Sequence, residues 1–125
     1  MNVLVVVAHP DDETIGCGGY IHKLSLDGHS IHLLCLTNGV SSRESKSNTL
    51  DSSSRFASCR RAAAHLGITT VDILDYPDNQ LDTISRLTLA KHVNDYFAKY
   101  SPNLILTHSI CDLNVDHRIC HEVVL

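Results

Sequence analysis

Apolar and polar positions divide this chain into short apolar runs and longer amphipathic segments. The apolar runs are continuous and rich in β-branched residues, which is typical of strands that are covered on both faces. The longer segments repeat their apolar positions with a helical period and stop at Gly28, at Gly67 and near Pro102. The pattern predicts strands at residues 3–8, 30–36, 69–74 and 104–106, and helices at residues 15–26, 55–66 and 81–100.

This alternation of strand and helix predicts an α/β fold with a Rossmann-like, mostly parallel sheet and helices on both faces. The 125 residues suit a single domain that covers residues 1–125. Residues 38–54 are rich in Ser and Asn and form a longer connection than such folds usually need. We expect this segment to be either a lid over the end of the first strand or a plain surface excursion.

Composition narrows the class of protein. The net charge of −4 comes without a basic run, which argues against nucleic acid as the main partner. No apolar stretch is long enough for a membrane span, and the first strand has no basic region before it, so we expect a soluble, cytoplasmic protein. The five cysteines are scattered and form no CxxC pair, which makes a disulfide framework or a thiolate zinc site improbable.

The first candidate site follows the first strand directly. His9-Pro10-Asp11-Asp12-Glu13 places an imidazole and three carboxylates at the position where ligands bind in open α/β sheets. His9 and Asp12 lie across one tight turn, so both side chains can converge on one cation while Asp11 points elsewhere. We therefore expect a metal, or catalysis, at this turn.

The second candidate site, residues 107–118, follows the fourth strand. If the first and fourth strands are near neighbours, His117 joins His9 and Asp12 in a site with open coordination positions, the usual composition of a catalytic zinc centre. The same three residue types form the facial triad of non-haem Fe(II) oxygenases, although those enzymes typically have β-barrel folds. A metal-binding module without catalytic activity is a further alternative. His108 and His121 are weaker candidates for a place in the site.

A family resemblance adds to this interpretation. Residues 8–13, Ala-His-Pro-Asp-Asp-Glu, are followed by Gly16-Cys17-Gly18-Gly19 and an amphipathic helix, and this order closely resembles the opening of the LmbE/PIG-L family of zinc-dependent N-acetylglucosaminyl deacetylases. Residues 114–117, Asn-Val-Asp-His, resemble a second family motif. Family members usually continue well beyond this length, so we expect a domain that lacks the family's C-terminal part.

The resemblance implies roles for the residues of both motifs. His9, Asp12 and His117 would bind Zn²⁺, with Fe²⁺ or another divalent metal as alternatives, and Asp11 would be the general base. Asp116 would orient its neighbours or cap a helix. Asn114 stands where better-known members have a His that helps to stabilise the tetrahedral intermediate; an amide can donate that hydrogen bond but cannot carry a proton.

Two further positions resemble substrate-binding residues of the family. Arg55 opens a motif that resembles Arg-x-x-Glu, with Ser58 in place of the Glu, and Asp78 follows the third strand. The plainer interpretations are a solvated arginine and a turn-forming aspartate. The implied substrate is a small N-acetylated amino-sugar conjugate, which would yield acetate and a free amine. Assembly into a homo-oligomer stays open.

Overall fold

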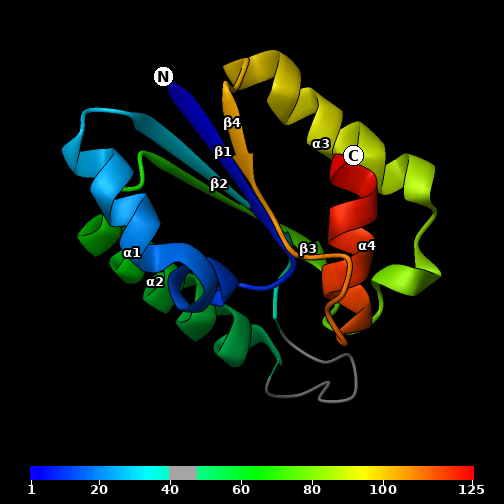
Figure 1. Cartoon of the computed structure of the whole chain (residues 1–125). Helices are drawn as coiled ribbons and strands as arrows, with labels where there is room; N and C mark the ends of the chain where they lie inside the picture. Colours follow the sequence, from blue (N-terminus) through cyan, green and yellow to red (C-terminus); the bar gives the residue numbers. More distant parts are fainter. Residues whose placement is uncertain (40–47) are drawn as a thin grey trace.

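The computed structural model describes residues 1–39 and 48–125, and the side chains of these residues except 48–53. Strands and helices alternate along the chain, as the sequence predicts (Figure 1). In chain order the elements are β1 (Asn2–Val7), α1 (Asp12–Leu26), β2 (Ser30–Thr37), α2 (Asn48–Leu66), β3 (Thr70–Tyr76), the 3₁₀ helix η1 (Leu81–Thr83), α3 (Arg86–Tyr100), β4 (Leu104–Leu106) and α4 (Val115–Val124).

The strands form one parallel sheet in the order β3-β2-β1-β4. The chain proceeds outward from β1 through β2 to β3 and then returns to place β4 on the other side of β1, with Val5 opposite Leu106. The direction of winding therefore reverses between β1 and β4. In open α/β sheets this reversal opens a crevice at the carboxyl ends of the two strands, where ligands bind.

Helices cover both faces of the sheet. Alternate β1 residues point to opposite sides: Val5 packs in a cluster with Ile21 of α1 and Cys59 of α2, whereas Val6 packs in a cluster with residues of α3 and α4 such as Ile119. Figure 1 shows α1 and α2 on one side and α3 and α4 on the other. Burial of each such side chain contributes about 1.5–3 kcal/mol, which explains the unbroken apolar run of β1. The predicted fold class is confirmed.

One predicted helix is wrong at its start. Residues 81–100 form two elements, because the backbone of Ser85 is extended (φ −62°, ψ 141°) and its hydroxyl accepts the Thr88 N–H at 3.1 Å. Such an N-cap satisfies a backbone donor that a continuing helix would bond internally, so α3 begins at Arg86. Other boundaries also differ: α1 begins at Asp12 and α2 at Asn48, both earlier than predicted, and β3 extends to Tyr76.

The long polar connection is shorter than the sequence suggests, because residues 48–54 already belong to α2. The rest of the predicted lid, residues 40–47, lies outside the described part of the chain. Cys35, Cys59 and Cys120 are buried, as expected of small apolar groups, and all five thiols are free. Within the described ranges, no helix combines the length and the apolar character needed to cross a membrane.

Candidate metal centre

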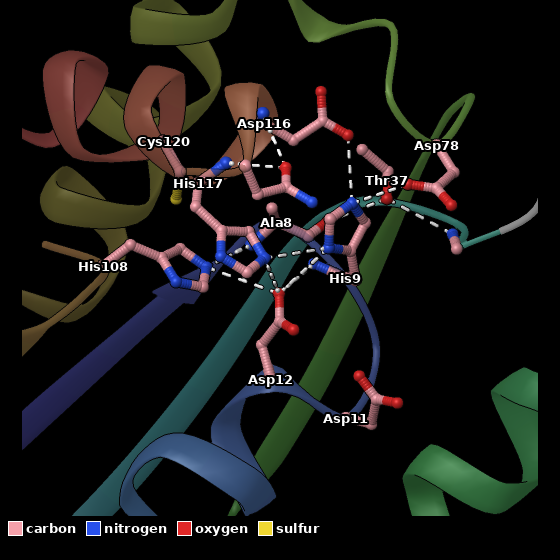
Figure 2. Close-up of polar contacts among 12 residues, drawn as sticks. Ala8, His9, Asp11, Asp12, Thr37, Asp78, His108, Asp116, His117 and Cys120 are labelled. Carbon is pink, nitrogen blue, oxygen red and sulfur yellow. Dashed lines mark hydrogen bonds and ion pairs between the residues drawn. The ribbon is translucent and has the colours of Figure 1, made fainter. Parts of the chain in front are cut away.

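Three side chains converge at the carboxyl ends of β1 and β4 (Figure 2). His9 follows β1, Asp12 opens α1, and His117 lies in the first turn of α4. His9 Nδ1, Asp12 Oδ2 and His117 Nε2 form a triangle in which each pair of atoms is 3.1 Å apart. The structure therefore brings together the three ligands that the sequence predicts, because β4 lies beside β1.

The triangle fits a small tetrahedral cation. An ion with ligand bonds of about 2.0–2.1 Å spaces its ligand atoms about 3.3 Å apart, close to the spacing found here. Two imidazoles and one carboxylate are also a donor set that Zn²⁺ accepts, and three protein ligands leave a coordination position for water or substrate. The contact between two imidazole nitrogens is itself informative, since a shared cation satisfies both lone pairs.

Carboxylates lie behind both histidines. His9 Nε2 is 2.9 Å from Asp116 Oδ2 and 2.7 Å from Asp78 Oδ1, and His117 Nδ1 is 2.9 Å from Asp112 Oδ2. A metal-binding histidine usually donates its other N–H to a carboxylate, which fixes the ring and leaves the remaining nitrogen lone pair for the metal. Both rings are thus oriented with a lone pair toward the centre of the triangle.

The surroundings of His9 are strongly anionic. Burial lowers the pKa of His9, but hydrogen bonds to Asp116 and Asp12 and the charges of Asp12 and Asp78 outweigh it and raise the pKa to about 10. A single positive charge is therefore strongly favoured at this point. A divalent cation bound here would provide positive charge in place of the imidazolium and would displace the proton from His9 Nδ1.

Two other histidines border the triangle without completing it. His108 Nε2 accepts the backbone N–H of Ala8 at 3.0 Å, so its lone pair is already used, and its ring stacks on His117 at 3.8 Å between ring centroids. His121 Nδ1 lies 2.7 Å from the backbone oxygen of His108. His108 therefore borders the site beside the His117 ring. His121 contacts the backbone of the loop that carries His108.

Asp11 lies between the two candidate ligands in sequence, and Figure 2 shows its carboxylate apart from the triangle, with no dashed line joining it to the other side chains drawn. It is the N-cap residue of α1, yet its side chain makes no capping bond, and its φ of 124° is unusual for a residue other than glycine. Such a backbone costs on the order of 1–3 kcal/mol and tends to persist at functional sites. Asp11 is exposed, next in sequence to the candidate ligand Asp12.

A pocket of about 300 Å³ adjoins Asp11 and includes Arg55 and Ser58 of α2 among its lining residues. Although Asp11 is exposed, partial desolvation by the surrounding protein and the negative charge of Asp12 raise its pKa, while the charge of Arg55 opposes this increase. A raised pKa makes a carboxylate a better proton acceptor. A Cβ at Gly39 would come within 3.2 Å of Arg55 Nη1, so a glycine at the end of β2 gives the guanidinium room.

Asn114 and Asp116 have different tasks in the structure. Asn114 is the N-cap of α4, and its side-chain oxygen accepts the N–H groups of Asp116 and His117 at 2.9 and 3.4 Å. The cap uses the amide oxygen, so the amide nitrogen is the atom that could donate to an oxyanion. Asp116 is fully buried and, besides contacting His9, accepts the N–H groups of Asn79 and Leu81. It therefore joins α4 to the segment that carries Asp78.

Two residues near the site escaped the sequence interpretation. Asp112 lies five positions before His117 in an irregular loop, and no periodic pattern connects it with that ring. Glu13 belongs to the first motif but has no role in the sequence prediction; its side chain is fully buried and accepts the Asp11 N–H. The burial of Glu13, which is 0% exposed, can be seen only in the structure, and it distinguishes Glu13 from the two aspartates before it.

Comparisons with known proteins agree with this arrangement. A family model described as PIG-L, GlcNAc-PI de-N-acetylase, matches residues 4–125. The diacetylchitobiose deacetylase of Thermococcus kodakarensis is 31% identical over 112 residues, which is 83% of this chain and 39% of that protein. The N,N'-diacetylchitobiose deacetylase from Pyrococcus horikoshii has a TM-score of 0.87 and 29% identity, with 98% of this chain and 47% of that chain covered.

A second similar structure belongs to a protein with a different activity. The 4-carboxy-2-hydroxymuconate hydratase from Pseudomonas putida has a TM-score of 0.85 and 24% identity over 98% of this chain and 53% of that chain. At this identity the likeness concerns the fold alone, and one fold can host different reactions. The chain spans about half, or less, of the length of these three proteins.

Proposed function

The chain belongs to the PIG-L family, described as GlcNAc-PI de-N-acetylases, and from this membership we propose that it acts as a metal-dependent hydrolase that removes the acetyl group from an N-acetylglucosaminyl substrate. The observation that carries the proposal is the 3.1 Å triangle of His9, Asp12 and His117, with the Asp11 carboxylate, which makes no capping bond, nearby. A metal site of open geometry and an adjacent base are the two requirements of metal-assisted amide hydrolysis.

Zinc is the ion that the donor set favours among the candidates, and Fe²⁺ or another divalent ion remains the alternative. His9, Asp12 and His117 would hold it. When bound, such an ion supplies Lewis acidity that lowers the pKa of water and polarises the acetyl carbonyl. The Fe(II) oxygenase alternative loses support, because the parallel α/β sheet differs from the barrels on which those triads typically occur.

The residues of this chain would divide the proton transfers among them. Asp11 accepts a proton from the water that attacks the acetamide carbon, and the Asn114 amide nitrogen donates to the oxyanion that forms. When the carbon–nitrogen bond breaks, Asp11 returns the proton to the departing amine. The products are acetate and the free amino sugar, so the reaction consumes one water and leaves Asp11 ionised again.

The substrate would enter from the side of the pocket that Asp11 and Arg55 share. Arg55 is suited to hydrogen bonds with sugar oxygens, and Asp78 has a side chain that is 35% exposed while it contacts His9. Two of the three similar proteins named above are deacetylases of diacetylchitobiose, which supports an N-acetylglucosaminyl group as the recognised part. We propose a small conjugate of this sugar, not a nucleic acid.

The test is a deacetylation assay on defined compounds. The purified protein is stripped with a chelator, reloaded separately with Zn²⁺, Fe²⁺ or Co²⁺, and given N-acetylglucosamine and N,N'-diacetylchitobiose while acetate and free amine are measured. We expect metal-dependent release of both products in equal amounts. Asp11→Asn should abolish most of this release, whereas Glu122→Gln, a change on the far part of α4, should not.

Full metal occupancy without acetate release from any compound of the panel would contradict the hydrolase and favour a binding module. Release that requires iron and a keto acid would instead favour an oxygenase.

A further inference from the structure

Glu13 is a buried carboxylate for which the proposed mechanism has no use. It lies in the first turn of α1, and its side chain is fully buried. Its Oε2 accepts the backbone N–H of Asp11 at 3.1 Å, and its Oε1 accepts the Cys59 thiol at 3.6 Å. Burial of a carboxylate is unfavourable unless its oxygens accept hydrogen bonds. An apolar side chain would fill this position at lower cost, which suggests a role for the carboxylate in its bond to Asp11.

The bond to Asp11 changes what the start of α1 can do. An aspartate at an N-cap normally turns its own carboxylate onto the first free N–H groups of the helix. Here Asp11 makes no such bond, and its φ of 124° turns the side chain out of the helix start. Glu13, in the first turn of the helix, accepts the Asp11 N–H; in a capping box the acidic residue does the same from one position later, and there the N-cap side chain bonds back.

We propose that Glu13 is a positioning residue, which holds the Asp11 backbone in its positive-φ conformation and so keeps the Asp11 carboxylate free and directed at the substrate pocket. The proposal rests on Asp11 as the base of the proposed reaction. Among the described residues, the hydrogen bonds of the Glu13 carboxylate go to Asp11 and Cys59, and Glu13 also lines the pocket beside Asp11. Its length, which lets the carboxylate reach back two residues, is the property that matters.

Because the length of the Glu13 side chain matters, two conservative variants should behave differently. Glu13→Gln keeps the length and an oxygen that can accept the Asp11 N–H, while its amide group faces the Cys59 sulfur. Glu13→Asp keeps the charge but is one methylene too short to reach the same N–H. A role in positioning therefore predicts that the uncharged variant works and the charged one fails, whereas an electrostatic role predicts the reverse order.

Kinetics with N,N'-diacetylchitobiose measure the difference. Glu13→Asp should lose about 10²-fold in kcat, the cost of a group displaced by about 1 Å, with KM within about twofold and metal content unchanged. Glu13→Gln should stay within about fivefold of the starting protein. Combined with Asp11→Asn, Glu13→Asp should cost almost nothing further, because the two residues act as a unit.

Amide hydrogen exchange at Asp11 supplies a readout that does not depend on activity. The Asp11 N–H should be protected in the starting protein and in Glu13→Gln, and should exchange at least about tenfold faster in Glu13→Asp while the amides of β1 stay protected. If the protein deacetylates nothing, the proposed function fails, and exchange alone still decides whether Glu13 holds Asp11.

Three results would overturn the proposal: equal exchange at Asp11 in all forms, greater loss in Glu13→Gln than in Glu13→Asp, or additive losses in the double variant. A Cys59→Ala variant controls for the core, since it removes the other partner of the Glu13 carboxylate. A loss in Cys59→Ala as large as that in Glu13→Asp would assign the effect to packing.

Discussion

The turn after β1 and the loop after β4 each supply a histidine to the same point, but they hold it by different means. After β1, residues 9–13 contain two candidate ligands and the proposed base within a single turn, where the backbone of Asp11 has a positive φ. After β4, eight residues of irregular chain separate the strand from α4, and His117 comes from the helix. One half of the site is fixed by a short covalent path, the other by hydrogen bonds.

The supports of the second half are correspondingly spread out. Asn114 caps α4, Asp112 fixes the His117 ring, and His121 holds the backbone at His108. Each of these contacts can be removed without touching a ligand. The comparison therefore teaches that substitutions near β1 should act on metal and catalysis directly, whereas most substitutions near β4 should act through the placement of one ring.

The largest effect should come from the ligands themselves. His9→Ala and His117→Ala each remove one of the three protein ligands, so the affinity for Zn²⁺ should fall by about three orders of magnitude or more in both. Titration calorimetry with a competing chelator measures this change. His65→Ala, at an exposed histidine of α2, is the control. Unchanged affinity in both ligand variants would show that the metal lies elsewhere.

Within the β1 turn, the two adjacent aspartates should separate metal binding from proton transfer. Asp12→Asn should lower the affinity for the metal, because an amide is a poorer ligand than a carboxylate. Asp11→Asn should keep the metal and the fold but lose about 10²–10⁴-fold in kcat, the usual contribution of a positioned base, with little change in KM. Metal analysis and kinetics on the same samples test this assignment. Loss of metal in Asp11→Asn, with metal retained in Asp12→Asn, would exchange the two roles.

Substitution of the carboxylates that contact the two imidazole rings, Asp116 at His9 and Asp112 at His117, should have intermediate effects on metal affinity. Asp116→Asn and Asp112→Asn should each reduce metal affinity by about 10–100-fold, the usual range for such partners. Asp116 is fully buried and also anchors Asn79 and Leu81, so its variant should be less stable to heat as well. Asp112 has a side chain that is 35% exposed, so Asp112→Asn should leave the melting temperature nearly unchanged.

The same contrast explains how far the sequence alone could lead. The β1 turn was predictable because a continuous apolar run, a histidine and the acidic residues lie next to one another, and chain geometry then requires them to be close. The predicted meeting of His9 with His117 depended on a condition that no local pattern contains, namely that β4 lies beside β1. That order appears only in the folded chain, where β4 pairs with β1 and α3 and α4 pack on the sheet.

The residues that sequence reasoning missed depend on such distant packing. Asp112 is identified as a partner only through the orientation of the His117 ring, and Glu13 only through its burial under α2. The predicted continuous helix over residues 81–100 failed for a local reason, because Ser85 offers a cap that competes with the apolar pattern. Motifs thus indicate the ligands, while the supports need the three-dimensional structure.

The last prediction concerns Asn114, which caps the helix that carries His117. Asn114→Ala should lower the free energy of unfolding by about 1 kcal/mol, because Asp116 and His117 lose the acceptor for their N–H groups. Asn114→Asp keeps that acceptor and should unfold like the starting protein, yet it lacks the amide donor. If the amide nitrogen stabilises the oxyanion, Asn114→Asp should lose about 10²-fold or more in kcat with no loss of stability. Thermal unfolding and kinetics of both variants separate the two roles, and full activity in a stable Asn114→Asp would leave Asn114 as a helix cap alone.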